Sequence, residues 1–299
     1  MENNTVKLHM KDFRKKYPVV HKTGLFLAGA LLILASGCVK DDLYNTPHPD
    51  KGAVVLDVDG LPNGDGYTVD IDGQTFEATG STFTVPDLFD SGTHTLTVYN
   101  RPEGFSVEGL VARVSPLEAA VRSTGGFIHP LPGYLHSGTR QIEVMADNNL
   151  NVEMSVSQRV RDLRLELTLT EGDPELIKSV TGTLAGIAGA FDLAAQKTTG
   201  EAVATVVAFT RTADKLTADA RLLGVIGAAQ TLRLEIGFTD RADIHRVSVD
   251  LSEAMKGFDD DMTATRKITG SVETPVGADE VTATITGWQD VYGDPTEAE

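Results

Sequence analysis

The segment from Val160 to Gly172, VRDLRLELTLTEG, alternates between apolar and polar residues. Four leucines occupy every second position, with polar residues between them: Leu163, Leu165, Leu167 and Leu169 against Arg164, Glu166 and Thr168. Successive side chains of a β-strand point to opposite faces, so this pattern predicts a long strand with one buried face. We expect this strand to begin a β-sandwich.

The same two-residue period extends in both directions along the chain. It recurs before this segment in AVVLDVDG, GYTVDIDG, STFTVPD, HTLTVYN and FSVEGLVARV, and after it in KSVTGTLAG, AVATVVAFTRTA, ADARLLGVIG, TLRLEIGFTD, HRVSVDLSEAM, RKITGSV and VTATITGW. Gly, Pro, Asp and Asn bound these segments, and Asp72-Gly73 is typical of a tight hairpin. The sequence therefore predicts an all-β protein, with at most a helical turn around 117–122.

The strands fall into two sets, which predicts two tandem β-sandwich domains. We expect the N-terminal sandwich over residues 51–157 and the C-terminal sandwich over residues 158–292, followed by a tail over 293–299. Either set is long enough for a sandwich of about 100 residues. A single larger sandwich is the alternative, and it would release no stable fragment on limited proteolysis.

Residues 1–37 have the pattern of an export signal. A basic segment precedes an uncharged, mostly apolar run over 23–34, which small residues follow. The run is shorter than the roughly 20 apolar residues of a membrane-spanning helix, which favours removal of the signal. Residues 38–50 are polar and contain Pro47 and Pro49, which predicts a tether rather than a folded element.

Cys38 is the only cysteine of the chain, and a lone thiol forms no internal disulfide in an exported protein. The segment LASGC resembles a bacterial lipoprotein signal, which implies cleavage between Gly37 and Cys38 and covalent diacylglycerol and palmitate on Cys38. Lys40, Asp41 and Asp42 resemble the signal that sends lipoproteins of Bacteroidetes to the exterior face of the outer membrane. The alternative is a buried or free cysteine after an ordinary signal peptide.

The charge balance argues against a nucleic-acid partner. The chain has 26 basic and 43 acidic residues. Cleavage after Gly37 would remove six basic and two acidic residues, which leaves 20 and 41 and a formal charge of −21. Such a surface repels phosphate backbones and anionic lipid head groups alike. We interpret the acidity mainly as a way to keep an exported domain soluble.

The motifs of common catalytic and metal sites are missing from the sequence. It contains no GxSxG, no GxxxxGK[ST] and no HExxH. His129 and His136 lie in a Pro/Gly-rich loop, and neither DVDGLPNGDG nor FDDDM has calcium-loop spacing. Trp288 follows a strand, and we interpret it as a buried side chain that fills the core at the end of the second sandwich. We therefore expect no enzyme, no metal and no cofactor besides the lipid.

The order of several segments resembles a known family. CVKDDLY, HTLTVYN, PLPGYLHSG, RQIEVMADNNLNVEMSVSQRVRDLRLELTL, SVTGTLAGIAGAFDL and EVTATITGW follow one another as in the FimB/Mfa2-type fimbrial anchoring lipoproteins and related fimbrillin-like surface lipoproteins of Bacteroidetes. The resemblance covers nearly the whole mature chain. It implies two transthyretin-like (Greek-key) sandwiches, held on the outer membrane by lipid, with a role in fimbria anchoring or cell adhesion and no catalytic residues.

The resemblance predicts a protein that works through contacts with fimbrial subunits or other surface proteins. A sandwich leaves backbone groups unpaired at its sheet edges, and a strand donated by a neighbouring subunit would satisfy them. A chain tethered through its own N-terminus is expected to accept such a strand or to cap the base of a filament. Two alternatives stay open at this point, a surface glycan-binding lipoprotein of a polysaccharide uptake system and a secreted hydrolase.

Overall fold

The computed structural model describes residues 50–62, 66–117, 126–171, 173–240, 242, 244–273 and 282–292. These residues form strands and two short 3-10 helices, which confirms the all-β prediction. Within these ranges no helix has the length and apolar character needed to cross a membrane. The signal peptide, the tether up to Pro49, most of the expected helical turn and the tail lie outside the described residues.

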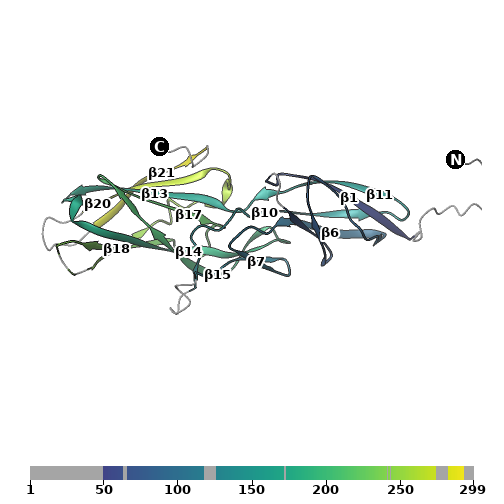
Figure 1. The fold of residues 1–299 in the computed structure, drawn as a ribbon, viewed down its shortest axis with the longest axis horizontal. Coiled ribbons are helices and arrows are strands. Elements are labelled where there is room, and N and C mark those ends of the chain that lie inside the picture. The colour runs from purple at the N-terminus through teal and green to yellow at the C-terminus, as the bar shows by residue number, and fades with distance from the viewer. Residues whose placement is uncertain are drawn as a thin grey trace, which may run out of the picture. The chain divides into compact units, whose positions relative to one another are not determined.

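Two sheets enclose the core near the N-terminal end of the described chain (Figure 1). The first has the order β11-β1-β4, with β5 also pairing with β1: Asn149–Ser155, Lys51–Asp59, Thr82–Thr84 and Phe89–Asp90. The second has the order β12-β10-β6-β2-β3: Ser157–Gln158, His136–Val144, Gly92–Asn100, Tyr67–Ile71 and Gln74–Ala78. β1 and β11 run parallel, from the pair Ala53 and Asn149 to the pair Asp59 and Ser155.

A two-residue turn joins β2 to β3, as the sequence predicts. Asp72 and Gly73 have φ angles of 53° and 89°, and the Gly73 N–H donates to Asp70 Oδ1. Both turn residues thus occupy the left-handed region that the favoured hairpin turns require. The turn sets the register of the hairpin, in which Tyr67 lies opposite Ala78.

Two further sheets enclose the second core. One has the order β16-β17-β13-β20-β21: Thr210–Thr212, Lys215–Leu222, Arg161–Glu171, Thr265–Glu273 and Thr282–Val291. The other has the order β19-β18-β14-β15-β9: Ile244–Asp250, Thr231–Phe238, Ile177–Asp192, Lys197–Ala208 and Phe127–Ile128. β13 is the central strand of the first of these sheets, and its four predicted core leucines are buried.

Three short strands that precede β10 in the chain belong to the sheet of the second core. β7 (Phe105–Glu108) pairs with β8 (Val111–Val114), β8 pairs with β14, and β9 pairs with β15. The sequence predicts this stretch in the N-terminal sandwich. The structure differs because Ala112 and Ile128 bury their side chains among those of β13, β14 and β15. The boundary near residue 158 itself stays a prediction.

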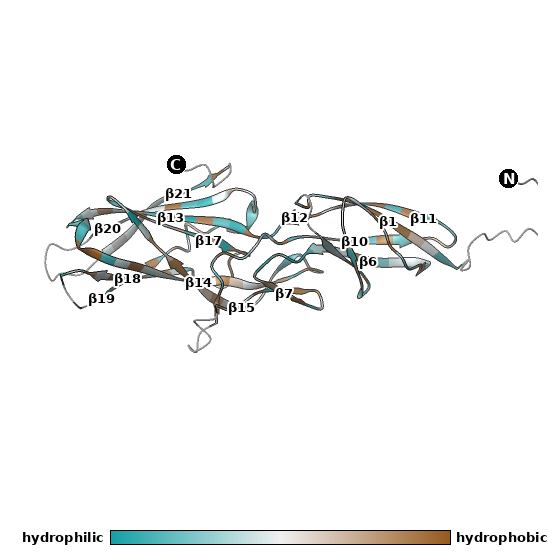
Figure 2. Cartoon of the chain, in the orientation of Figure 1, coloured by the Kyte–Doolittle hydropathy of each residue, from teal (hydrophilic) through white to brown (hydrophobic). Residues whose placement is uncertain are grey.

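The buried side chains form two clusters. The first holds 16 residues between Val54 and Val156, and the second extends from Tyr99 to Val272. Hydrophobic and hydrophilic residues alternate along most of the strands (Figure 2), and in β1 the inward positions are Val54, Leu56 and Val58. Burial of these apolar faces supplies the main favourable term for folding. The predicted β-sandwich class is therefore confirmed.

Trp288 does not fill the core, contrary to the sequence-based interpretation. It lies opposite the buried Ile268 on β21, but 49% of its surface is exposed. β21 is the edge strand of its sheet in the described part of the chain, so only β20 flanks it within that sheet. Tyr292, just beyond the strand, is 72% exposed.

His94 on β6 should make the stability of the N-terminal sandwich depend on pH. Burial by itself lowers the pKa of His94, but the Asp90 carbonyl and the Asp72 carboxylate together outweigh it and raise this pKa above 6.5. The contact with Asp72 is 2.7 Å and that with the Asp90 oxygen is 2.8 Å.

A raised folded-state pKa means that the protonated ring favours the folded chain. This contribution is complete below the unfolded-state pKa of about 6.5 and is lost as pH rises through the folded-state value. We expect the urea midpoint to fall between pH 6 and pH 8 in the native chain and to change less in His94→Gln. Parallel midpoint curves for the two chains would contradict this assignment.

Candidate functional site

A groove of about 770 Å³ lies at one side of the N-terminal sandwich. Residues of β1, β4, β10 and β11 line it. β10 and β11 follow each other in the chain but belong to different sheets, so the groove lies where the edges of the two sheets face each other. Its apolar lining includes the buried side chains of Leu56, Ile142 and Val152.

The two strands approach closely at the ends of the groove. At one end, a Cβ added to Gly138 on β10 would lie 2.5 Å from the carbonyl oxygen of Ser155 on β11. At the other end, the chain passes directly from β10 to β11 through residues 145–148. The open part therefore corresponds to the middle of both strands.

Part of the β11 backbone faces this groove rather than β1. The Asn148 carbonyl accepts from Ala53 and the Val156 N–H donates to Asp59, so the even-numbered residues face β1. The N–H and C=O groups of one residue of a strand point to the same side, and those of the next residue point to the other side. The N–H and C=O groups of Asn149, Asn151 and Glu153 therefore face away from β1. The Glu153 carbonyl accepts a hydrogen bond of 2.8 Å from Arg140 Nη1, a side chain of β10.

The charges along the groove are mostly acidic. Asp57, Glu143 and Glu153 carry negative charge, and Arg140 is the only basic residue among those that line it. The Thr93 hydroxyl donates to Glu143 at 2.7 Å. The groove thus offers one cationic side chain, already engaged with backbone, and three carboxylates to an incoming chain.

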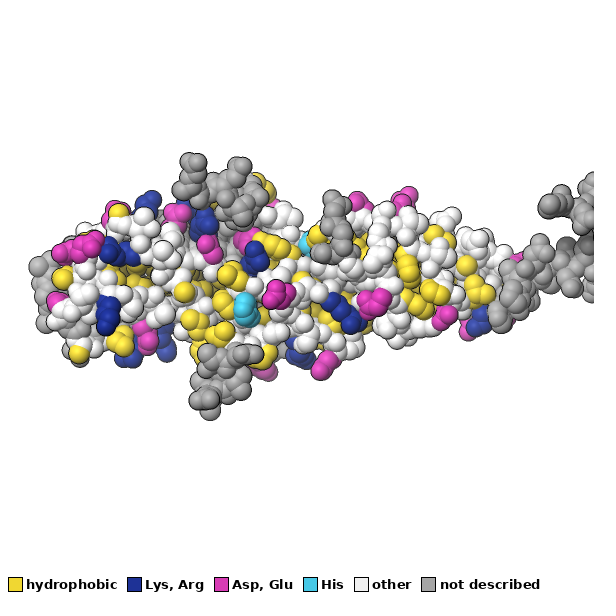
Figure 3. All heavy atoms as spheres, viewed as in Figure 1, with side chains coloured by type: hydrophobic (Ala, Val, Ile, Leu, Met, Phe, Trp, Pro, Cys, Tyr) yellow, Lys and Arg dark blue, Asp and Glu magenta, His cyan; other side chains and the backbone are white. Residues whose placement is uncertain are grey.

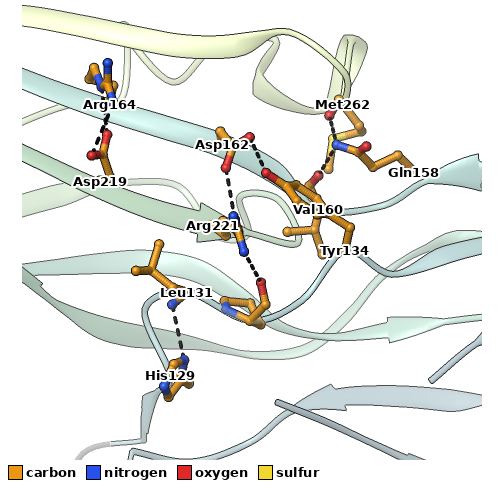
Figure 4. Close-up of polar contacts among 11 residues, drawn as sticks. His129, Leu131, Tyr134, Gln158, Val160, Asp162, Arg164, Asp219, Arg221 and Met262 are labelled. Carbon is orange, nitrogen blue, oxygen red and sulfur yellow. Dashed lines mark hydrogen bonds and ion pairs between the residues drawn. The ribbon is translucent and has the colours of Figure 1, made fainter. Parts of the chain in front are cut away.

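A polar network surrounds the start of β13 (Figure 4). The Tyr134 hydroxyl donates to Asp162 at 2.7 Å, and Arg221 donates to the same carboxylate while its guanidinium lies over the Tyr134 ring. Burial, followed by the contact with Asp162, raises the pKa of Tyr134 to about 12. The Gln158 amide bridges the carbonyls of Val160 and Met262. These contacts join the loop before β10 to the start of β13 and to β17.

Two buried arginines share one carboxylate at the end of β21. Arg161 is fully buried and Arg266 is 5% exposed, and both contact Asp290 Oδ1, at 2.7 and 3.1 Å. Arg161 also donates to the carbonyls of Phe258 and Ala264. Burial lowers the pKa of Arg161, and the carboxylate of Asp290 acts in the opposite direction.

The lipid-attachment residues of the sequence analysis lie outside the described residues. They are Gly37, Cys38, Lys40, Asp41 and Asp42. The structure therefore leaves the lipid anchor and the surface-export signal as predictions.

The histidine pair and the acidic loops do not form metal sites in the described part of the chain. His129 Nδ1 accepts from the Leu131 N–H (Figure 4), while the backbone N–H of His136 donates to Asn100 Oδ1. In FDDDM, Asp261 accepts from Thr263, which keeps its pKa at about 2. The described ranges hold no group of three or more His, Cys, Asp or Glu residues placed to bind a metal ion.

The face of the molecule seen in Figure 3 shows basic side chains scattered among acidic ones rather than gathered into a stripe. A nucleic-acid backbone is bound by clustered Lys and Arg.

The sequence matches the model of one protein family, the fimbrillin-A associated anchor proteins Mfa1 and Mfa2, over residues 63–292. No curated protein sequence matches the chain.

Several solved structures share the fold. The fimbrial anchor protein Mfa2 from Porphyromonas gingivalis superposes with a TM-score of 0.55 at 12% identity, covering 82% of this chain and 100% of its own. A proposed adhesin from Bacteroides ovatus gives 0.56 at 15% identity, with 82% and 98% covered. A proposed polysaccharide-binding protein from Bacteroides thetaiotaomicron gives 0.53 at 9% identity, with 81% and 98% covered.

The family match covers well over half of the chain, and it agrees with the order of segments noted in the sequence. The chain belongs to the family of fimbrillin-A associated anchor proteins Mfa1 and Mfa2.

Proposed function

We propose that this protein is an outer-membrane surface lipoprotein that serves as an anchoring or accessory subunit of fimbriae in cell adhesion. The observation that carries the proposal is the family match over residues 63–292. The lipoprotein-like segment LASGC, which ends at Cys38 and so precedes the matched region, supports attachment to a membrane. The partners would be fimbrial subunits or other surface proteins, bound without catalysis.

The lipid would be carried by Cys38, as diacylglycerol and palmitate. Cleavage after Gly37 would leave this cysteine as the N-terminus, and residues 38–50 would connect it to β1. Lys40, Asp41 and Asp42 would direct the protein to the exterior face. Each acyl chain contributes about 0.8 kcal/mol of membrane affinity per buried CH₂ group. Because a single acyl chain binds the membrane only reversibly, stable attachment needs a second one.

The mechanism would be strand pairing at a sheet edge. β-strand addition gives affinity through main-chain hydrogen bonds and specificity through alternate side chains. Because the N-terminus would be held at the membrane, we expect this protein to accept a strand from a neighbour or to cap the base of a filament.

Lipid attachment is tested by growing the native host with radioactive palmitate. We expect label in the native chain and in Ser36→Ala, which keeps a small residue before the cleavage site, and no label in Cys38→Ala. Since Cys38 is the only cysteine, no other thiol can carry the label. An unlabelled native chain would overturn the lipoprotein assignment.

The fimbrial role is tested on the same lipidated protein, purified from outer membranes in mild detergent. We expect secreted β-rich subunits to co-purify in stoichiometric amounts, and negative-stain images to show filaments with this protein at one end. A chain that emerges alone, or beside a polysaccharide transporter, would refute the anchoring role.

A glycan-binding lipoprotein is the second candidate, and one observation favours it. Trp288 and Tyr292 are exposed near the end of β21, and exposed aromatic rings are good contact surfaces for ligands with apolar faces. Retention of the native chain, but not of Trp288→Ala, on polysaccharide gels would support this candidate.

A further inference from the structure

We propose that the parallel pairing of β1 with β11 is a force-bearing clamp, which resists extraction of β1 when the membrane tether and the rest of the assembly pull on the chain in opposite directions. The inference rests on the proposed function, because it takes residues 38–50 to be held at a membrane through Cys38. It assigns to these two strands a mechanical role in addition to their part in the fold.

The chain enters the N-terminal sandwich through β1, at one end of the sandwich. Lys51 opens β1, and its carbonyl accepts from the Asp147 N–H at 2.8 Å. Asp147 lies in the connection that joins the end of β10 to the start of β11. Tension carried by the tether therefore acts first on Lys51, beside this connection.

The connections to the strands of the second core leave the N-terminal sandwich at its opposite end. β6 ends at Asn100, β10 begins at His136, and β12 ends at Gln158. His136 lies opposite Gln158, and its N–H donates to Asn100 Oδ1 at 2.7 Å. These three residues therefore lie together, and the length of β10 separates them from the connection at Asp147. A partner held by the second core would pull on this end.

The parallel pairing makes such a load act along the strands. The register runs from the pair Ala53 and Asn149 to the pair Asp59 and Ser155. β1 and β11 therefore start at the same end, and both run toward the connections to the second core (Figure 1). Tension pulls β1 backward along its own axis while β11 is held from its far end. Because the interstrand bonds lie across the strands, this load shears them together, whereas a load that separates two adjacent ends breaks them one at a time.

Backbone bonds hold β1 along both of its sides. On the side of β11, the Asp59 carbonyl accepts from the Val156 N–H at 2.9 Å. On the side of β4, the Val58 N–H donates to the Ser81 carbonyl at 2.7 Å. Alternate residues of β1 thus bond to opposite neighbours. Extraction of β1 must break both rows of bonds.

The buried face of β1 opposes a gradual slip along the strand axis. Val54, Leu56 and Val58 point into the core, with 0%, 0% and 5% of their surfaces exposed, whereas Asp57 and Asp59 are exposed. A shift by one residue would turn the inward side chains outward and bring these carboxylates into the core, which is costly for a charged group. β1 therefore either stays in register or leaves as a whole.

The test pulls the same sandwich in two directions by single-molecule force spectroscopy. Both chains lack the signal peptide and carry Cys38→Ser and Asp50→Cys. The shear chain adds Ser155→Cys, at the far end of β11, and the peel chain adds Asn148→Cys, just before β11. The side chains of Asp50, Asn148 and Ser155 are exposed, so a DNA handle on each cysteine leaves the core untouched.

The first rupture in both chains is expected to release β1. We expect its force to be at least about twofold higher in the shear chain, because the interstrand bonds share the load instead of breaking in turn. The urea midpoints of the two chains are the control. They should agree, because equilibrium stability has no direction, whereas forced unfolding follows the unfolding rate along the direction of pulling. Equal rupture forces, or a higher force in the peel chain, would overturn the clamp.

The outcome is separable from that of the proposed function, because neither of these two chains carries lipid. Equal rupture forces beside palmitate label on Cys38 of the native chain would keep the membrane anchor and refute the clamp. A higher force in the shear chain, beside a native chain that takes no label, would overturn the anchor and with it the mechanical role, although the strand pair resists force.

Discussion

Replacing Arg161 with alanine should lower the free energy of unfolding by about 3–5 kcal/mol, the cost of breaking a buried ion pair by removing one partner. Arg161 is fully buried, and its guanidinium contacts Asp290 at 2.7 Å and the Ala264 carbonyl at 2.6 Å. It also lies over the Phe258 ring, 5.1 Å from its centroid. Alanine replaces none of these contacts.

The large expected effect follows from what the substitution leaves behind. Carbonyl oxygens of Phe258 and Ala264 lose a donor inside the protein, and an unsatisfied buried acceptor costs about 1–3 kcal/mol. The contact of Arg161 Nη2 with Asp290 is an ion pair rather than a well-directed hydrogen bond. Arg266 still pairs with Asp290 in the variant, so the Asp290 carboxylate is not left without a cation and the loss of unfolding free energy is limited.

Arg164→Ala is the matched control, because it removes an arginine from the same strand. Its partner is Asp219 at 2.8 Å, and the two side chains are 27% and 53% exposed. Exposed pairs of this kind contribute about 0–1 kcal/mol. Urea unfolding of chains that lack the signal, residues 1–37, measures both variants, and equal losses for the two would contradict the role given to burial.

The strands that the sequence predicts best are those in which the pattern is local. In β13 the alternation of Leu163 to Leu169 identifies both the strand and its buried face. The Asp72-Gly73 turn is equally local, because its φ angles depend on two residues. The fold class follows from such segments.

Features that depend on the order of strands within a sheet are not visible in the sequence. Trp288 has the pattern of a core residue and faces the same way as Ile268, yet it is half exposed because β21 happens to be an edge. β8 and β9 precede β10 in the chain and pair with β14 and β15, which follow it. These strands are separated in the chain by β10 and other strands, so their order in the sequence does not predict that they pair.

The candidate groove was missed for the same reason. RQIEVMA and LNVEMSVSQRV predict two strands, and the structure places their edges beside each other. The bond from Arg140 to the Glu153 carbonyl needs a side chain of one sheet to reach the backbone of another. Only the three-dimensional arrangement shows that the Glu153 carbonyl faces away from β1 and that Arg140 donates to it.

Replacing Leu165 with alanine should lower the free energy of unfolding by about 2–5 kcal/mol, the range for large-to-small substitutions in a packed core. Leu165 is 1% exposed on the central strand β13, and its neighbours across the sheet are Ala218 and Ile268, at 3% and 0% exposure. Because the residue directly opposite on β17 is an alanine, its short side chain cannot fill the cavity. We therefore expect a loss in the upper half of the range.

Thr168→Ala on the opposite face of β13 is the control, and it should change stability much less, because Thr168 is only partly buried. Hydrogen exchange followed by mass spectrometry adds a test of the two-sandwich prediction. If the two cores unfold as separate cooperative units, Leu165→Ala should speed exchange in β13, β17 and β20 and leave β1, β6 and β10 unchanged. Equal acceleration in both groups of strands would instead favour a single larger sandwich.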